Sequence, residues 1–203
     1  FDGIASYPLS KLIFTIFKNS INTIQHSLFQ TQFDIDPIIP MLVKRKKILD
    51  ELNKISSIST NFNIRNSFAL GTIGGNQNAR LDYVNNIINS DYTFCYRGAA
   101  NYSLRFYETL CLGRIPLFIN TDCVLPFENE IPWNDICLWI EDSEIEHLGE
   151  KITDYHYSMN GNQFREKQAE CRKVWEKYLS RKGFYLNFKN QIAKMVPKIM
   201  DEK

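Results

Sequence analysis

The spacing of apolar residues predicts helices and strands that alternate through the middle of the chain. Apolar side chains recur at helical intervals in residues 42–55 and 77–88, and a third helix is expected over residues 103–112, with Gly113 at its end. The faces expected to be buried are Val43, Ile48, Leu49, Leu52 and Ile55 in the first helix, and Leu81, Val84, Asn85 and Ile88 in the second. Short apolar runs predict three strands, at residues 92–95, 115–119 and 137–140.

The flanking segments carry further predicted elements. Residues 61–69 alternate as a strand does, whereas residues 11–18 fit a buried helix or a strand equally well. Ser143 and Glu146 have the spacing of a capping box, which predicts a helix from there to Thr153. Two long helices are expected after it, over residues 162–179, with Phe164, Cys171, Val174, Trp175 and Tyr178 on the inner face, and over residues 184–200, with a break near Pro197.

Strands alternate with helices from about residue 60 to residue 153. This order predicts an α/β fold, a Rossmann-like parallel sheet with helices on both faces, closed by the C-terminal helices. We expect residues 36–203 to form this domain and residues 1–35 to be an N-terminal segment that belongs or leads to another domain. Ligands of such sheets bind at the carboxyl ends of the strands, so the turns after the strands are where a site is expected.

Composition and charge exclude several classes of protein. The 203 residues suffice for one compact domain, and an apolar share of 44% argues against disorder. The 24 basic and 23 acidic residues give a net charge of +1, which argues against a dedicated nucleic-acid binder. The apolar runs are too short to span a membrane. The start at Phe1 shows no signal-peptide pattern and suggests that sequence upstream is missing.

The cysteines and histidines indicate neither a disulfide framework nor a metal centre. The five cysteines are widely spaced and include no Cys-x-x-Cys pair, so we expect buried, reduced thiols. The three histidines have no partners at the spacing of metal ligands. A structural metal is therefore not expected.

The turn after the strand at residues 92–95 carries the strongest candidate chemistry. A helix that begins near Ser103 offers backbone N–H groups and the positive end of its dipole to a phosphate. Arg105 adds a cation with paired donors, and Glu108, three positions later, can accept from a ribose diol. These residues suit a nucleoside diphosphate, although a capped helix with a surface Arg–Glu pair has the same pattern. A glycan on the sequon at Asn101 would obstruct this turn.

This stretch resembles the donor-binding signature of the exostosin family of glycosyltransferases. Five motifs of that signature occur in order: Arg97-Gly98, Ser103-Leu104-Arg105-Phe106-Tyr107-Glu108, Gly113-Arg114-Ile115-Pro116, Leu125-Pro126-Phe127 and Trp133. The resemblance extends from about Lys44 to Leu179. It implies an inverting transferase of the two-domain GT-B type, of which this chain would be mainly the donor-binding half. Tyr96 replaces the proline that usually precedes the Arg-Gly pair, so a less rigid turn is expected.

The resemblance also implies roles for individual residues. Ser103 and Arg105 would hold the donor diphosphate, Glu108 would hold the ribose, and Arg97 would shape or charge the pocket. Arg45 is the best match to an upstream arginine of the family that meets phosphate, although a solvated basic run also explains it. Another alignment places Ser10 at that position, with Phe1-Asp2-Gly3 before it and no arginine. Asp122, Glu128 and Glu130 follow the strand at residues 115–119 and are candidates for contacts to the donor sugar, or for capping.

The implied reaction transfers a sugar from a nucleoside-diphosphate sugar, a substrate rather than a cofactor, to a glycan or other hydroxyl acceptor, with inversion and without a metal. One alternative is a module that binds nucleotide sugars without catalysis. Another is a metal-dependent transferase in which Asp34 and Asp36 hold a divalent cation. The glycine-rich residues 71–76 lack the Lys-Ser/Thr of a phosphate-binding Walker loop and favour an ordinary turn. A cytoplasmic location is expected from the reduced thiols, although many eukaryotic members of the family are Golgi membrane proteins.

Overall fold

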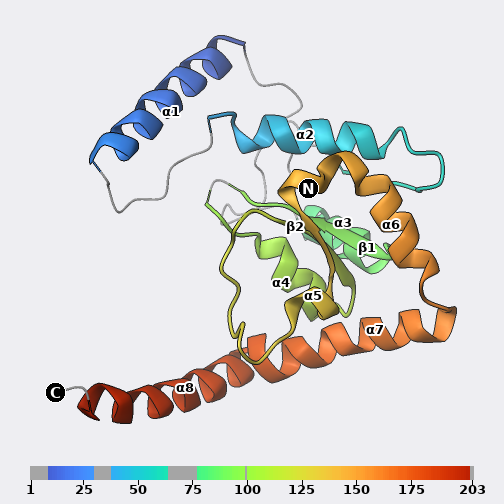
Figure 1. Ribbon diagram of the computed structural model, residues 1–203. Helices are drawn as coiled ribbons and strands as arrows, with labels where there is room; N and C mark the ends of the chain where they lie inside the picture. The colour runs from blue at the N-terminus through green and yellow to red at the C-terminus, as the bar shows by residue number, and fades with distance from the viewer. Residues whose placement is uncertain (1–8, 30–37, 64–76, 99, 202–203) are drawn as a thin grey trace.

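The computed structural model describes residues 9–29, 38–63, 77–98 and 100–201, with the backbone alone for residues 29, 77–78 and 195–201. The chain forms a mixed α/β structure in which helices surround a small sheet (Figure 1). The strands are β1 (Tyr92–Cys95), β2 (Ile115–Asn120) and β3 (Leu138–Glu141). The α-helices are α1 (Leu9–Phe29), α2 (Met41–Leu52), α3 (Gln77–Ile88), α4 (Leu104–Cys111), α5 (Trp133–Ile136), α6 (Leu148–Tyr157), α7 (Gly161–Val174) and α8 (Arg181–Asp201). A 3-10 helix, η1 (Asp142–His147), and a π-helix, η2 (Trp175–Leu179), complete the described elements.

The sheet is parallel, with β2 in the centre. Tyr92 pairs with Ile115, and Leu117 pairs with Leu138. The three strands lie within one residue of the positions that the sequence predicts. The predicted strand at residues 61–69 is not seen over residues 61–63, which are irregular, and its remainder lies outside the described residues.

Helices cover both faces of the sheet, as the alternation of elements predicts. Successive side chains of β2 point to opposite faces, as in any strand. Phe118 packs with Phe106 of α4 and Cys171 of α7 in one apolar core. Leu117 and Ile119 pack in a second core, with apolar residues of α2 and α6. The arrangement is compatible with a Rossmann-like domain.

Helix α3 turns a different face inward from the one predicted. Ile87 is completely buried, whereas the side chain of Leu81 is 59% exposed and Asn85 and Ile88 are also exposed. Apolar residues occur on more than one side of this helix, so its own sequence does not specify which side meets the sheet. Val84 alone of the predicted inner residues is half-buried.

Other helices confirm or correct the prediction. Residues 11–18 are helical, within α1, and the inner faces predicted for α2 and α7 are the observed ones. The capping box uses Glu141 and Glu144 and opens η1, so the box predicted at Ser143 and Glu146 is wrong. Helix α8 continues through Pro197 instead of breaking there.

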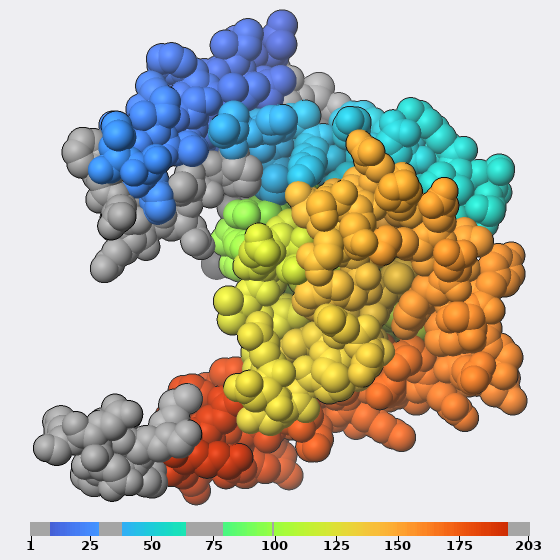
Figure 2. All heavy atoms as spheres, viewed as in Figure 1, coloured from blue at the N-terminus to red at the C-terminus, as the bar shows by residue number. Residues whose placement is uncertain are grey.

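The loop after β2 lies on a recess in the molecular surface. Figure 2 shows this recess at the left, with α1 above it, α8 below it and the yellow loop on its inner edge. Because the loop follows the carboxyl end of a parallel strand, the recess lies where ligands of such sheets bind. Within the described ranges, no helix combines the length and the apolar character that a membrane span requires.

Candidate functional site

Helix α4 begins at the carboxyl side of β1, as predicted. Ser103 is the residue that precedes its first turn, and the Ser103 side chain does not bond the N–H groups of that turn. The preceding turn is closed by a hydrogen bond of 3.1 Å from the Gly98 N–H to the Tyr102 carbonyl. Gly113, with a φ of +61°, follows the helix end, as expected for the left-handed position after a helix. The Ser103 hydroxyl and the start of α4 therefore stand at the ligand end of the sheet.

Tyr83 of α3 joins Arg105 and Glu108 of α4. The Arg105 guanidinium carbon lies 4.7 Å from the centre of the Tyr83 ring, within range of a cation–π interaction. The Tyr83 hydroxyl donates a hydrogen bond to Glu108 Oε2. Burial raises the pKa of Tyr83 and outweighs the opposing charge of Arg105, so the hydroxyl stays protonated. Sequence reasoning missed Tyr83, because the inner side of α3, on which Tyr83 precedes the buried Ile87 by four residues, is known only from the structure.

Arg45 is brought to the same place from α2. Its side chain is 9% exposed, and Nη2 donates to the Tyr96 carbonyl at 2.9 Å and also to the Arg97 carbonyl. Burial, and then the charge of Arg105, lowers the pKa of Arg45 to about 10. It therefore remains a cation at pH 7. Arg45 and Arg105 thus place two positive charges close enough to interact beside the end of β1.

Tyr96 anchors the turn that its replacement of proline was expected to loosen. The side chain is 1% exposed and its ring stacks on Phe94, with centroids 6.1 Å apart. Its hydroxyl donates to Asp142 Oδ1 at 3.1 Å, and Asp142 also forms an ion pair with Lys44 of α2. The carboxyl ends of β1 and β3 and the start of α2 are therefore held together by one buried phenol.

The remaining candidates lie around the loop after β2. Arg97 has a buried Nε that forms no hydrogen bond within the described part of the chain. Burial raises the pKa of the Cys123 thiol, although the nearby positive charge of Arg97 acts to lower it. Asp122 is exposed, whereas the Glu128 carboxylate accepts the Leu125 N–H at 2.9 Å and closes its own turn. Of these two carboxylates, Asp122 is the one left open to a ligand.

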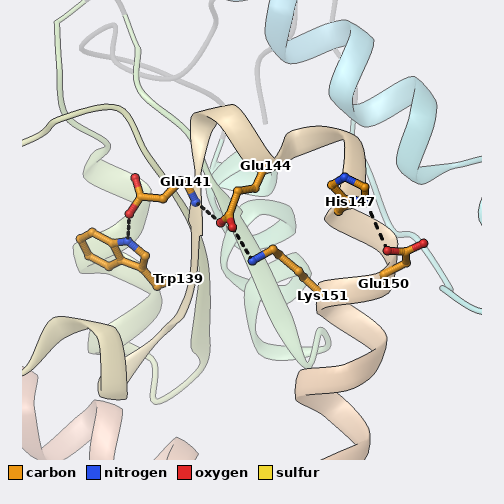
Figure 3. A network of polar contacts seen from close by, with 6 residues as sticks. All are labelled: Trp139, Glu141, Glu144, His147, Glu150 and Lys151. Atoms are coloured by element: carbon orange, nitrogen blue, oxygen red, sulfur yellow. Dashed lines mark hydrogen bonds and ion pairs between the residues drawn. The ribbon is translucent and has the colours of Figure 1, made fainter.

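Carboxylates at the end of β3 are occupied with structural contacts. Glu141 accepts from Trp139 Nε1 at 2.6 Å and from Asn120 Nδ2 at 2.8 Å. Glu144 accepts from the Glu141 N–H at 3.2 Å and from Lys151 Nζ at 2.8 Å (Figure 3). These contacts tie β3 to β2 and to α6, so we assign Glu141 and Glu144 to the framework.

Some of the predicted site residues lie outside the described part of the chain. Asp34 and Asp36, residues 71–76 and the Phe1-Asp2-Gly3 motif lie outside the described residues, while Ser10 lies in α1. Among the described residues, no three His, Cys, Asp or Glu side chains gather as metal ligands would. None of the five cysteines forms a disulfide, and all except the half-buried Cys111 are buried, which confirms the expectation for the thiols.

Comparison with known proteins identifies the family. The family model of the Exostosin GT47 domain matches residues 13–154, well over half of the chain. The chain belongs to the Exostosin GT47 family. This match spans the five signature motifs and confirms the resemblance seen in the sequence.

Curated relatives agree with this assignment. The chain is 30% identical to Exostosin-1 of Drosophila melanogaster over 99 residues, which cover 49% of this chain and 12% of that protein. It is 28% identical to the Exostosin-1 homolog of Caenorhabditis elegans over 100 residues, 49% of this chain and 25% of that protein. A probable beta-1,4-xylosyltransferase of Arabidopsis thaliana is 36% identical over 62 residues, 30% of this chain and 15% of that protein. This GT47 chain therefore matches only a quarter or less of the length of each of these relatives.

Proposed function

We propose that this chain is the donor-binding part of a glycosyltransferase and binds a nucleoside-diphosphate sugar. The diphosphate lies at the start of α4, held by Ser103, Arg105 and Arg97, with Arg45 behind them. Glu108 accepts from the ribose hydroxyls, next to the Tyr83 hydroxyl that already bonds it. The observation that carries the proposal is the buried Arg45 beside Arg105 at the carboxyl end of β1.

Burial of Arg45 carries a desolvation penalty, and the neighbouring charge of Arg105 adds to it. The lowered pKa of Arg45 expresses this penalty. A bound diphosphate would relieve it, because an anion favours the charged form of both arginines. The dipole and N–H groups of α4 act in the same direction, and the buried Nε of Arg97 supplies a further donor. The cluster therefore has the charge and the donors that suit a bound diphosphate.

We propose transfer with inversion. The acceptor hydroxyl oxygen bonds to the sugar C1 as the bond from C1 to the diphosphate oxygen breaks, and a general base takes the hydroxyl proton. The nucleoside diphosphate leaves with its charge stabilised by the arginines and by α4, so the proposal requires no metal. The GT-B arrangement supplies the acceptor site and the base from a second Rossmann-like domain. Because the residues of the proposed site all serve the donor, we expect this chain alone to bind donor but transfer sugar slowly.

The test is binding of UDP, GDP, ADP and the corresponding nucleotide sugars to the chain, measured by thermal shift and calorimetry. A ligand at 100 times its dissociation constant stabilises the fold by about 2.7 kcal/mol, and for a chain of this size this corresponds to about 5–11 °C. We expect one nucleoside diphosphate and its sugars to produce such a shift. The absence of a shift with all of them at millimolar concentration would refute the proposal.

A further inference from the structure

One asparagine side chain joins the two loops that border the proposed donor site. Asn101, in the loop between β1 and α4, donates from Nδ2 to the carbonyls of Thr121 at 2.9 Å and Asp122 at 3.2 Å. The Thr121 hydroxyl returns a hydrogen bond of 2.7 Å to Asn101 Oδ1. Both donors and the acceptor of one carboxamide are thus committed to the loop that follows β2.

This contact holds Asp122 in an unusual backbone conformation. Asp122 has a φ of +55°, in the left-handed region that residues other than glycine seldom adopt. Such a conformation persists where its surroundings enforce it, and here the bond from Asn101 falls on the carbonyl of Asp122 itself. The Asp122 carboxylate is exposed and makes no hydrogen bond or ion pair with any described residue. The backbone of Asp122 is thus held in place, while its carboxylate is available to a ligand.

The two loops meet where a diphosphate and its sugar would lie next to each other. The loop of Asn101 runs from Arg97 to Ser103, which are proposed to bind the diphosphate, and the charge of Arg97 reaches Cys123, the neighbour of Asp122. In the proposed pose the sugar lies on the side of β2, the strand that pairs with β1. A carboxylate at that point can accept hydrogen bonds from sugar hydroxyls.

We propose that Asn101 is a positioning residue, which sets the Asp122 carboxylate to bind the hydroxyls of the donor sugar. This inference rests on the proposed function, because it needs the diphosphate at the start of α4. Asn101 and Asp122 then act as one unit that recognises the sugar and contributes nothing to binding of the diphosphate itself. The same Nδ2 is the atom that a glycan would modify in the sequon Asn101-Tyr102-Ser103, so the residue is used as a clamp and stays unglycosylated.

The experiment compares the affinities for UDP and for UDP-glucose, UDP-xylose and UDP-glucuronate by calorimetry, in the wild type and in N101A, D122N and the double variant. We expect each single variant to weaken binding of the preferred UDP sugar about tenfold, as expected for loss of a charge-assisted hydrogen bond, and to leave UDP binding within about twofold. The double variant should bind the UDP sugars as each single variant does, because both substitutions remove the same contact, that of Asp122 with the sugar. N129A is the control, an exposed asparagine of the loop after β2 that also carries Asp122, and should bind like the wild type.

The outcomes separate this inference from the proposed function. If UDP and its sugars weaken equally in N101A, the residue is only structural and the inference is wrong, while the proposed function stands. Unchanged affinity for the sugars in D122N overturns it as well. If N101A does not fold, T121V removes a single bond of the clamp and should show a smaller loss, again confined to the UDP sugars. If the wild type binds neither UDP nor any UDP sugar, this inference about UDP sugars is wrong, whereas the proposed function fails only if GDP, ADP and their sugars do not bind either.

Discussion

Replacement of Arg105 by alanine should separate binding from stability. In the proposed site the guanidinium bonds the donor diphosphate, and hydrogen bonds to charged groups contribute about 1.5–3 kcal/mol. Arg105→Ala should therefore raise the dissociation constant of the nucleoside diphosphate about 10- to 150-fold. Glu108→Ala removes the bonds to the ribose hydroxyls and the bond from Tyr83 but leaves the cations that face the diphosphate, so it should raise the dissociation constant less than Arg105→Ala does.

Stability should change little in Arg105→Ala. The variant loses the contact with the Tyr83 ring at 4.7 Å, a contact worth about 0.5–1 kcal/mol. Burial is the main cause of the lowered pKa of Arg45, and the variant removes the second cause, the positive charge of Arg105, which offsets part of that loss. We expect the free energy of unfolding to stay within about 1 kcal/mol of the wild type.

Calorimetric titration at constant ionic strength, paired with urea unfolding, measures both quantities. Arg165→Ala is the control, because Arg165 is exposed on α7 and, among the described residues, bonds only Asn162 beside it. Arg105→Lys keeps the charge but loses the paired donors, so its affinity for the nucleoside diphosphate should lie between that of the Arg105→Ala variant and that of the wild type. A folded Arg105→Ala protein whose dissociation constant is within twofold of the wild type would refute the assignment of the diphosphate to α4.

Three further predictions follow from the described contacts. Tyr83→Phe keeps the ring next to Arg105 but removes the hydrogen bond to Glu108, so calorimetry should show severalfold weaker binding of the nucleoside diphosphate. Arg105→Lys should change the dissociation constant by the same factor in this variant as in the wild type. Gly183→Ala places a methyl group 2.5 Å from a backbone carbonyl of η2 and should destabilise the fold by about 1–3 kcal/mol in urea unfolding; an unchanged midpoint would contradict the packing of α8 on η2. Burial raises the pKa of Cys95 to about 12, so at pH 8 a thiol reagent should label Cys111 quickly and the other four thiols only after denaturation; rapid labelling of two or more native thiols would contradict the core.

The sequence by itself determined the elements that bear the candidate site. The apolar runs at residues 92–95 and 115–119, the helix that starts after Ser103 and its end before Gly113 all agree with the structure. These features depend on residues that are neighbours in the chain, so their signals are local. The order of serine, arginine and glutamate in α4 was visible for the same reason, and so was the membership of the family.

Only the tertiary structure decided which side chains meet at that site. Arg45 reaches the turn after β1 from 51 residues away, Tyr83 reaches Glu108 across 25, and Asn101 reaches Thr121 across 20. Such contacts depend on how each helix is rotated about its axis when it packs, and the local pattern leaves that rotation open wherever apolar residues occupy more than one face. Helix α3 shows this directly: its pattern predicted Leu81 inside, whereas Ile87 is the buried residue, and Tyr83, four positions before Ile87, contacts Arg105.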